Sequence, residues 1–224
     1  MGELADRRAR RNRASRRALR TRTNLLSAAL ALFSEKGIEG TTIEQITERA
    51  DVGKGSFYNH FENKEAVMIA LVEMAVDGLA QKMNRPERSA GSLGGAIEHL
   101  VEAHADFFQN HYAEFLLLFQ GRVLLKLQSE TPEQLEEPYI RYIEVIENRI
   151  RPFAGEGIEP TRLRRFACAL AGFVSGFFSF AMIGMSAEAM EKSLRPLRRA
   201  FVATSTAFLG RENVRSERPP NASG

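Results

Sequence analysis

Residues 41–65 read TTIEQITERADVGKGSFYNHFENKE, and this stretch decides the fold of the N-terminal part of the chain. Thr41 or Thr42 is the N-cap of a first short helix, because each has a Glu or Gln three residues later that can close a capping box. Three apolar residues share one face of this helix: Ile43, Ile46 and Ala50. Residues 51–53 then interrupt the helical pattern. We therefore expect two short helices joined by a tight turn.

The second of these helices, at residues 54–61, has the composition of a DNA-reading element. Phe57 and Phe61 are four residues apart and would face the core. The other positions carry hydrogen-bond donors and no carboxylate, as contacts to phosphates and base edges require. Asn63 can cap a further helix that begins at Lys64. The predicted DNA-contacting residues are Thr42, Lys54, Gly55, Ser56, Tyr58, Asn59, His60 and Lys64.

Residues 25–67 resemble the DNA-binding domain of TetR-family transcriptional regulators, with LFSEKG at 32–37 followed by TTIEQITERADVGKGSFYNHFENKEAV. The resemblance implies that residues 54–60 form the recognition helix and that Lys64 contacts a phosphate. The alternative is a pair of ordinary helices with solvated lysines. Three residues depart from the family pattern: Thr47 replaces a common alanine, Asp51 a common glycine, and Gly53 a common capping serine.

These departures predict small local costs. Glycine is a tolerable N-cap, so the recognition helix would start slightly less firmly at Gly53. Asp51 would fit less well than glycine if its backbone needs a positive φ, although aspartate is among the better substitutes there. We expect a complete helix-turn-helix motif at about residues 42–61.

The composition predicts a soluble, all-α, intracellular protein, and the resemblance implies that it lies in the bacterial cytoplasm, associated with the nucleoid. The chain has 224 residues, of which 44% are hydrophobic and 26% charged, which suffices for one large or two small cores. Its one cysteine excludes an intramolecular disulfide. The chain opens on a very basic stretch without the apolar run of a secretory signal. Helical patterns dominate, and no convincing strand pattern is present.

The charge is distributed unevenly. Residues 1–22 contain nine arginines against Glu3 and Asp6, a balance of +7, so the rest of the chain sums to −4 within a net charge of +3. We expect a basic, disordered arm at residues 1–17. Such an arm can neutralise phosphates or enter a minor groove, or it can remain a solvated tail, because a charge run specifies attraction and no geometry.

The remainder of the chain predicts a second helical domain. We assign residues 18–66 to the DNA-binding domain, 67–210 to an effector-binding and dimerisation domain, and 211–224 to a disordered tail. Within the second domain, residues 166–187 lack charge, which makes them long and apolar enough for a membrane span. Small residues on one side of this segment instead favour close packing between helices.

The resemblance implies that the last two long helices pack against their two-fold mates in a homodimer without any membrane contact. A dimer would read a palindromic double-stranded DNA operator, which a single helix-turn-helix is too short to select. The membrane-tethered alternative stays open at this point. The predicted dimer-interface residues are Cys168, Gly172, Ser175, Gly176, Ser179, Leu197, Phe201 and Thr204.

Aromatic residues of the second domain are material for an apolar cavity that binds a small-molecule effector, although most such residues simply form core. A ligand bound there would change the spacing of the two recognition helices and release a repressor from its operator. The predicted pocket residues are His104, Phe108, Phe115, Phe119, Arg122, Tyr142 and Phe177. The identity of the effector and of the operator does not follow from the sequence.

Enzymatic functions find little support in the sequence. Cys168 lies in the uncharged run, where a thiol is usually an inert packing residue. His104 and His111 share a helix face, but no third ligand at metal spacing completes a site. The glycines near residue 91 lack the residues that a phosphate-binding loop needs. We expect no cofactor, no metal and no catalytic residue; an all-α enzyme or carrier remains the alternative.

Overall fold

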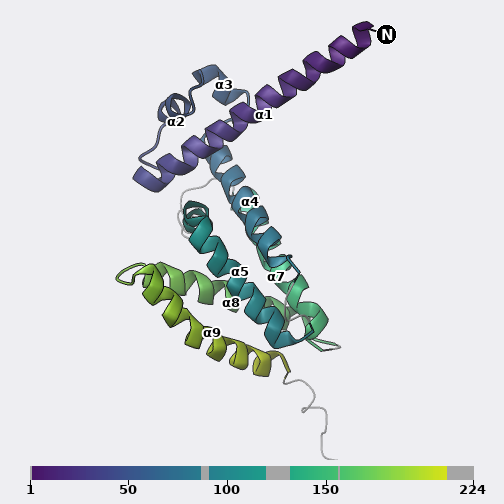
Figure 1. The fold of residues 1–224 in the computed structure, drawn as a ribbon, viewed down its shortest axis with the longest axis vertical. Coiled ribbons are helices and arrows are strands. Elements are labelled where there is room, and N and C mark those ends of the chain that lie inside the picture. The colour runs from purple at the N-terminus through teal and green to yellow at the C-terminus, as the bar shows by residue number, and fades with distance from the viewer. Residues whose placement is uncertain (1, 87–90, 120–131, 156, 211–224) are drawn as a thin grey trace, which may run out of the picture. The chain divides into compact units, whose positions relative to one another are not determined.

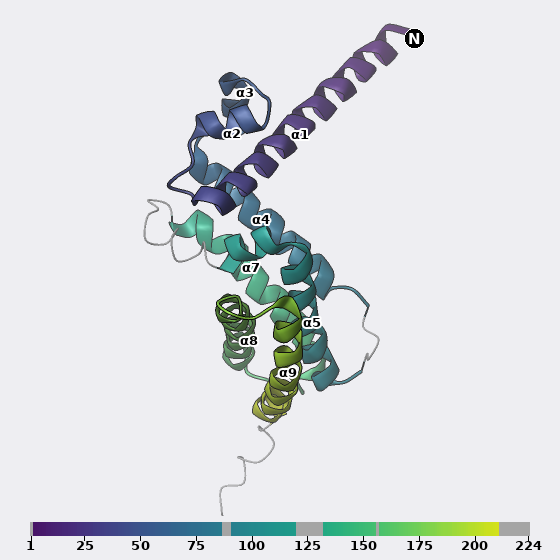
Figure 2. The ribbon, with the colours of Figure 1, turned by 60° about the vertical axis from the view of Figure 1, so that its left-hand side comes forward.

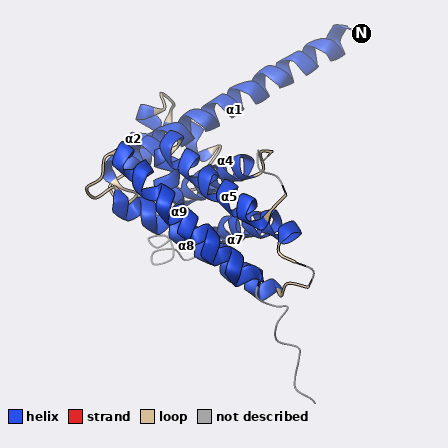
Figure 3. Ribbon diagram, turned by 60° about the horizontal axis from the view of Figure 1, so that its bottom comes forward, coloured by secondary structure: helices blue, strands red, loops and turns tan. Residues whose placement is uncertain are grey.

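The computed structural model describes residues 2–86, 91–119, 132–155 and 157–210, and within them the chain is helical, with no strand (Figures 1 and 3). The predicted all-α class is confirmed. The helices are α1 (Gly2–Lys36), α2 (Ile43–Arg49), α3 (Lys54–Tyr58), α4 (Lys64–Met83), α5 (Leu93–Asn110), α7 (Pro132–Ile150), the 3-10 turn η1 (Arg151–Phe153), α8 (Pro160–Ala181) and α9 (Ala187–Gly210). Residues 112–119 are also helical.

The chain divides into two compact units. The first contains Met1–Ala75 and Ala113–Leu135, and the second contains Val76–Tyr112 and Glu136–Gly224. The division falls within α4, later than the predicted boundary at residue 66. The predicted domain limits stay a prediction, because compactness alone does not identify the segment that binds DNA.

The first unit is built around α1, α2 and α3, as the capping and apolar patterns require. Thr42 caps α2 in a full capping box: its Oγ1 accepts from the Gln45 amide at 3.3 Å, and its own amide donates to Gln45 Oε1 at 3.2 Å. Ile46 and Phe57 are fully buried and Phe61 nearly so. The Arg22 guanidinium lies over the Phe61 ring at 5.2 Å, which joins α1 to the end of the motif.

The prediction of a disordered arm at residues 1–17 is corrected by helix α1, which already begins at Gly2. The basic stretch consists mainly of arginine, alanine and leucine, which are strong helix formers, and after Gly2 it contains no glycine or proline before residue 37. It also continues directly into a helix whose far end is anchored in the core through Leu25 and Leu26. Charge repulsion therefore does not prevent the helix from extending.

Asp51 occupies the turn between α2 and α3 with φ of 54°, a left-handed conformation. The strain foreseen from the sequence is therefore present. Its amide still donates to the Glu48 carbonyl at 3.1 Å, so the turn remains hydrogen-bonded. A side chain at this φ crowds its own backbone, which only glycine avoids.

Replacing Asp51 with glycine is expected to raise the free energy of unfolding by roughly 0.5–1 kcal/mol, because the relief of strain exceeds the extra entropy of an unfolded glycine. Replacing it with alanine should lower that free energy, since alanine lacks the local hydrogen bonding that helps aspartate in this region. Urea titrations of the three proteins give the order. The protein with glycine at position 51 should be the most stable, wild type intermediate and the alanine variant the least stable. An Asp51→Gly protein less stable than wild type would show that Asp51 is not strained.

The second unit is formed by the C-terminal part of α4 with α5, α7, α8 and α9 (Figures 1 and 2). Helix α5 packs against both α8 and α9, which also contact each other. Their buried side chains include Leu100, Phe107, Leu163, Leu170 and Phe178. Helix α7 starts at Pro132 and continues through Pro138. Helix α9 likewise continues through Pro196.

Helix α8 contains most of the uncharged segment and is long and apolar enough to cross a membrane, by length and composition alone. One side of it is nevertheless core: Leu163, Phe166, Leu170, Val174 and Phe178 are buried. The core helix of a water-soluble protein passes the same test. Packing against α5 and α9 therefore accounts for the apolar residues on the buried side of α8.

Candidate nucleic-acid interface and ligand-binding regions

Helix α3 exposes polar residues on one side and buries a single aromatic on the other. Phe57 is fully buried, whereas the adjacent Tyr58 is 52% exposed. Lys54, Gly55 and Asn59 are exposed, and Ser56 and His60 are half-buried. The two rings of Phe57 and Tyr58 meet edge to face at 5.4 Å, so the buried ring supports the exposed one. The six predicted recognition residues thus lie outside the core, exposed or half-buried, and their contacts with DNA stay a prediction.

Two ion pairs hold the motif in place on its exposed side. The Arg49 guanidinium binds Glu35 through two hydrogen bonds of 2.6 and 2.7 Å, joining α2 to α1. The Lys54 ammonium binds the Glu44 carboxylate, joining α3 to α2. The hydrogen bond from Lys54 lowers the pKa of Glu44 and, in return, raises the pKa of Lys54. A phosphate contact by Lys54 would therefore compete with Glu44, which sequence patterns did not reveal.

Lys64 has a second role beyond the predicted phosphate contact. Its half-buried ammonium donates to the carbonyls of Ile38, at 2.7 Å, and Thr41, at 3.1 Å. These bonds tie the loop between α1 and α2 to the start of α4, which Asn63 caps through Ala66. An ammonium has three N–H donors, so one remains for a phosphate. The phosphate contact stays a prediction, and the loop contact explains why lysine suits this position.

In the second unit, His104 and Tyr142 form a buried polar pair between α5 and α7. His104 is fully buried; its Nδ1 lies 2.6 Å from the Leu100 carbonyl and its Nε2 lies 2.7 Å from the Tyr142 hydroxyl. Because the carbonyl can only accept, Nδ1 carries the proton and Nε2 accepts from Tyr142. Burial lowers the pKa of His104 to about 4, so the ring is neutral near pH 7.

This pair makes stability depend on pH in a defined direction. The unfolded chain protonates His104 near its ordinary pKa of 6.5, whereas the folded protein resists protonation down to about 4. The stabilisation is therefore complete above pH 6.5 and is lost as the pH falls towards 4. Between pH 7 and 5 we expect a loss of about 2 kcal/mol of unfolding free energy from this residue. Urea titrations at both pH values measure it, and in His104→Gln the loss should shrink by that amount.

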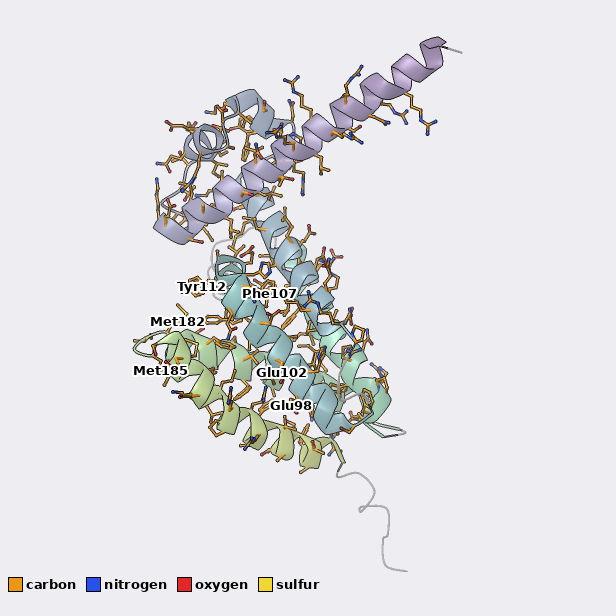
Figure 4. The ribbon with its side chains drawn as sticks, viewed as in Figure 1. Glu98, Glu102, Phe107, Tyr112, Met182 and Met185 are labelled. Carbon is orange, nitrogen blue, oxygen red and sulfur yellow. The ribbon has the colours of Figure 1, made fainter. Side chains whose placement is uncertain are left out.

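A groove of about 1010 Å³ lies between α5, α8 and α9. Phe108 and Phe178 stack in it with ring centroids 4.3 Å apart, and Met190 and Leu194 add apolar surface. Arg198 ties α9 to α5 beside them: it binds Glu102 at 2.7 Å and Glu98 at 3.2 Å. Figure 4 shows these two glutamates on α5 and labels Tyr112, which lines the groove, and Met182. Tyr112 donates to the Met182 sulfur at 3.4 Å.

The predicted pocket residues fall into separate groups. Of these residues, Phe108 lines the groove, and Phe177 contacts the groove residue Phe178 at 5.3 Å. Phe115 and Phe119 contact each other within the first unit, and Arg122 lies outside the described residues. The predicted pocket therefore stays a prediction. The sequence analysis did not identify the groove residues of α9. A usable signal was the spacing of Glu98 and Glu102 on one face of α5, because both carboxylates bind Arg198 of α9.

The predicted dimer residues of α8 and α9 lie on the outer side of the second unit. Cys168, Gly172 and Thr204 are exposed, and Leu197 is 45% exposed. Phe201 is half-buried and stacks on Phe173 at 4.4 Å. Ser175, Gly176 and Ser179 are half-buried. At the end of α8 two large apolar side chains, Phe180 and Ile183, are 78% and 80% exposed. The predicted dimer interface stays a prediction.

No group of three or more histidine, cysteine, aspartate or glutamate side chains that could hold a metal ion occurs in the part of the chain that the structure describes. The exposed thiol of Cys168 is free.

Comparison with known proteins gives a consistent result. Residues 25–71 match the family model "Bacterial regulatory proteins, tetR family". The chain is 26% identical over 204 residues to the HTH-type transcriptional repressor DhaR of Mycobacterium sp. (strain GP1), covering 88% of this chain and 96% of DhaR. It is 24% identical over 140 residues to the uncharacterized HTH-type transcriptional regulator YerO of Bacillus subtilis (strain 168), covering 60% of this chain.

The alignment with YerO spans about half of that protein, 47% of its length. Among solved structures, the TetR family transcriptional regulator PfmR from Thermus thermophilus has the same fold, with a TM-score of 0.60 and 22% identity, covering 80% of this chain and 97% of PfmR. The relatives regulate transcription and are not enzymes.

Proposed function

We propose that this chain, a transcriptional regulator of the tetR family, is a homodimeric repressor that binds a palindromic operator and leaves it when a small hydrophobic molecule binds. The exposed polar side of α3 carries the DNA-binding part of this proposal. It combines an exposed Tyr58 and Asn59 with a helix held in place by the buried Phe57. The family match over residues 25–71 supports the same conclusion.

The proposed DNA contacts are Thr42 at the start of α2, Lys54 to His60 in and after α3, and the free donor of Lys64. Asn and Tyr side chains read base edges or bind phosphates, and Lys contacts phosphates. Gly55 lets the backbone approach the DNA closely. A single motif of this size contacts only a few base pairs, so two copies related by a two-fold axis are required to select a genomic site.

The proposed dimer uses the outer sides of α8 and α9. The small residues Gly172 and Gly176 would allow a partner helix to approach, and the exposed Phe180, Ile183 and Leu197 would bury apolar surface against it. The relatives give no support to the membrane-tethered alternative. We place the protein in the cytoplasm, as is general for this family.

The proposed effector is hydrophobic or amphipathic. The groove between α5, α8 and α9 supports this, because its apolar residues lie beside the arginines of α9. A molecule inserted there would separate α9 from α5 against the Arg198 ion pairs. It can release DNA only in proportion to its preference for the DNA-free state.

Selection of bound sequences from a pool of random DNA duplexes tests this function. The proposal requires enrichment of an inverted repeat with a fixed spacing between half-sites. A screen of apolar and amphipathic compounds by thermal shift, followed by measurement of operator release, tests the effector. A single unrepeated site, or no enrichment, contradicts the dimeric reader. Compounds that stabilise the protein without releasing DNA contradict ligand control.

A further inference from the structure

Exposed arginines line the N-terminal half of α1, which is a helix and not a loose arm. This half extends past α2 and α3 in two views (Figures 1 and 2), and nitrogen-tipped side chains project around it in Figure 4. The exposed arginines described there are Arg8, Arg11, Arg13, Arg16, Arg17 and Arg20. A helix fixes the direction of each side chain, so the position of a charge around the axis becomes meaningful.

A depression of about 800 Å³ in the first unit connects α1 to the recognition residues. Arg17 and Arg20 line it from α1, and Ser56, Asn59 and His60 line it from the other side. The remaining lining residues are Ala14, Ala18, Thr21, Asn24, Ala50, Asp51 and Val52. Asp51 is the one carboxylate among these lining residues, against two guanidinium groups. An anion that contacts Asn59 or His60 therefore also meets the arginines of α1.

Helical register extends this cationic surface towards the N-terminus. Arg13, Arg17 and Arg20 are spaced i, i+4 and i+7, so they share one face of α1, and we name them the arginine stripe. With about 3.6 residues per turn, Arg8 and Arg11 lie on the opposite side of the same helix. The stripe spans about 10 Å along the axis.

We propose that the arginine stripe binds DNA phosphates flanking the base pairs that α3 contacts, as a rigid helical extension of the reading surface. This inference rests on the proposed DNA-binding function. Because Arg17 and Arg20 of the stripe line the same depression as Ser56, Asn59 and His60, the phosphates that the stripe binds belong to the same duplex. Guanidinium groups on a preformed helix lose less entropy on binding than those on a flexible arm. The stripe thus adds affinity, and each contact adds to the salt dependence of binding.

The test compares two double variants with equal loss of charge: Arg13→Gln/Arg17→Gln in the stripe, and Arg8→Gln/Arg11→Gln on the opposite side. Glutamine is nearly as good a helix former as arginine, so α1 is retained, and circular dichroism checks this. Affinity for the selected duplex is measured across a range of salt. The slope of log K against log salt is negative, and its magnitude should decrease by about 1.8 per protomer in the stripe variant. In the control variant it should decrease by less than half of that.

Duplex length gives a second readout. Adding a flank of about 10 base pairs to each end of the selected repeat should strengthen binding of wild type and of the control variant, and not of the stripe variant. Equal losses of slope in both variants overturn the inference, since they indicate attraction without register. An unchanged slope in the stripe variant also overturns it. If wild type itself prefers no sequence, the proposed function is wrong. If wild type prefers the selected duplex but the stripe variant has the same salt slope as wild type, only the proposal about the arginine stripe is wrong.

Discussion

Replacing Gly55 with glutamate is expected to lower operator affinity by at least about 100-fold while the protein stays folded. Gly55 lies in α3 on its exposed side, and a Cβ atom added there meets nothing within 4 Å. Glutamate is also a better helix former than glycine, so the substitution does not weaken α3 itself. Its carboxylate would, however, face the phosphates and acceptor-rich base edges of a bound groove. Fluorescence anisotropy with the selected duplex measures the loss.

Gly55→Gln is the matched control, because it adds nearly the same volume without the charge. It should lose clearly less affinity than Gly55→Glu, and the difference reports the electrostatic part. Tyr58→Ala should also weaken specific binding, since it removes the exposed ring and hydroxyl. Lys64→Ala is a poorer probe, because Lys64 also holds the carbonyls of Ile38 and Thr41. A folded Gly55→Glu protein with wild-type affinity would show that α3 does not face DNA.

Replacing Gly172 with glutamate is expected to convert the dimer into monomers and to lower operator affinity by about 100-fold or more, because two linked half-sites then bind separately. Gly172 is exposed on α8, and an added Cβ meets nothing within 4 Å in the single chain. The fold of one protomer should therefore tolerate the change. Across a two-fold axis the new carboxylates would lie close together in an apolar interface, at a cost of several kcal/mol.

Ile140→Glu serves as the control for this experiment. Ile140 lies on α7, a helix outside the proposed interface, and is 47% exposed, so it also receives a charge at an exposed apolar position. Analytical ultracentrifugation should find monomers only for Gly172→Glu. If that variant remains dimeric, the outer side of α8 is not the interface. If it becomes monomeric yet keeps full operator affinity, dimerisation is not required for reading DNA.

Local signals in the sequence predicted the DNA-binding motif well, because its determinants are close in sequence. The capping box at Thr42, the burial of Phe57 and Phe61, and the positive φ at Asp51 all follow from residues within a few positions. The prediction of a disordered arm at residues 1–17 was wrong because it considered the charge of this segment and not its helix propensity. The lesson is that a basic run rich in arginine and alanine can extend an anchored helix.

Contacts between distant segments could not be predicted in the same way. Arg198 binds Glu98 and Glu102 about a hundred residues earlier, and periodicity specifies only which side of each helix is polar. The same limit applies to the effector region, where Phe108, Phe115 and Tyr142 are buried and the predicted cavity stays a prediction. His104 and Tyr142 satisfy each other's hydrogen bonds, which a list of pocket-forming residue types does not reveal.

One ratio decides whether α3 reads DNA sequence. It is the affinity for the selected operator divided by the affinity for a scrambled duplex of equal length and composition, at one salt concentration near physiological. We expect a ratio of about 1,000 or more for wild type, as specific DNA-binding proteins show. In Gly55→Glu the ratio should fall towards one. A wild-type ratio near one, with tight binding to both duplexes, would mean that the arginines of α1 attract DNA and that α3 reads no sequence.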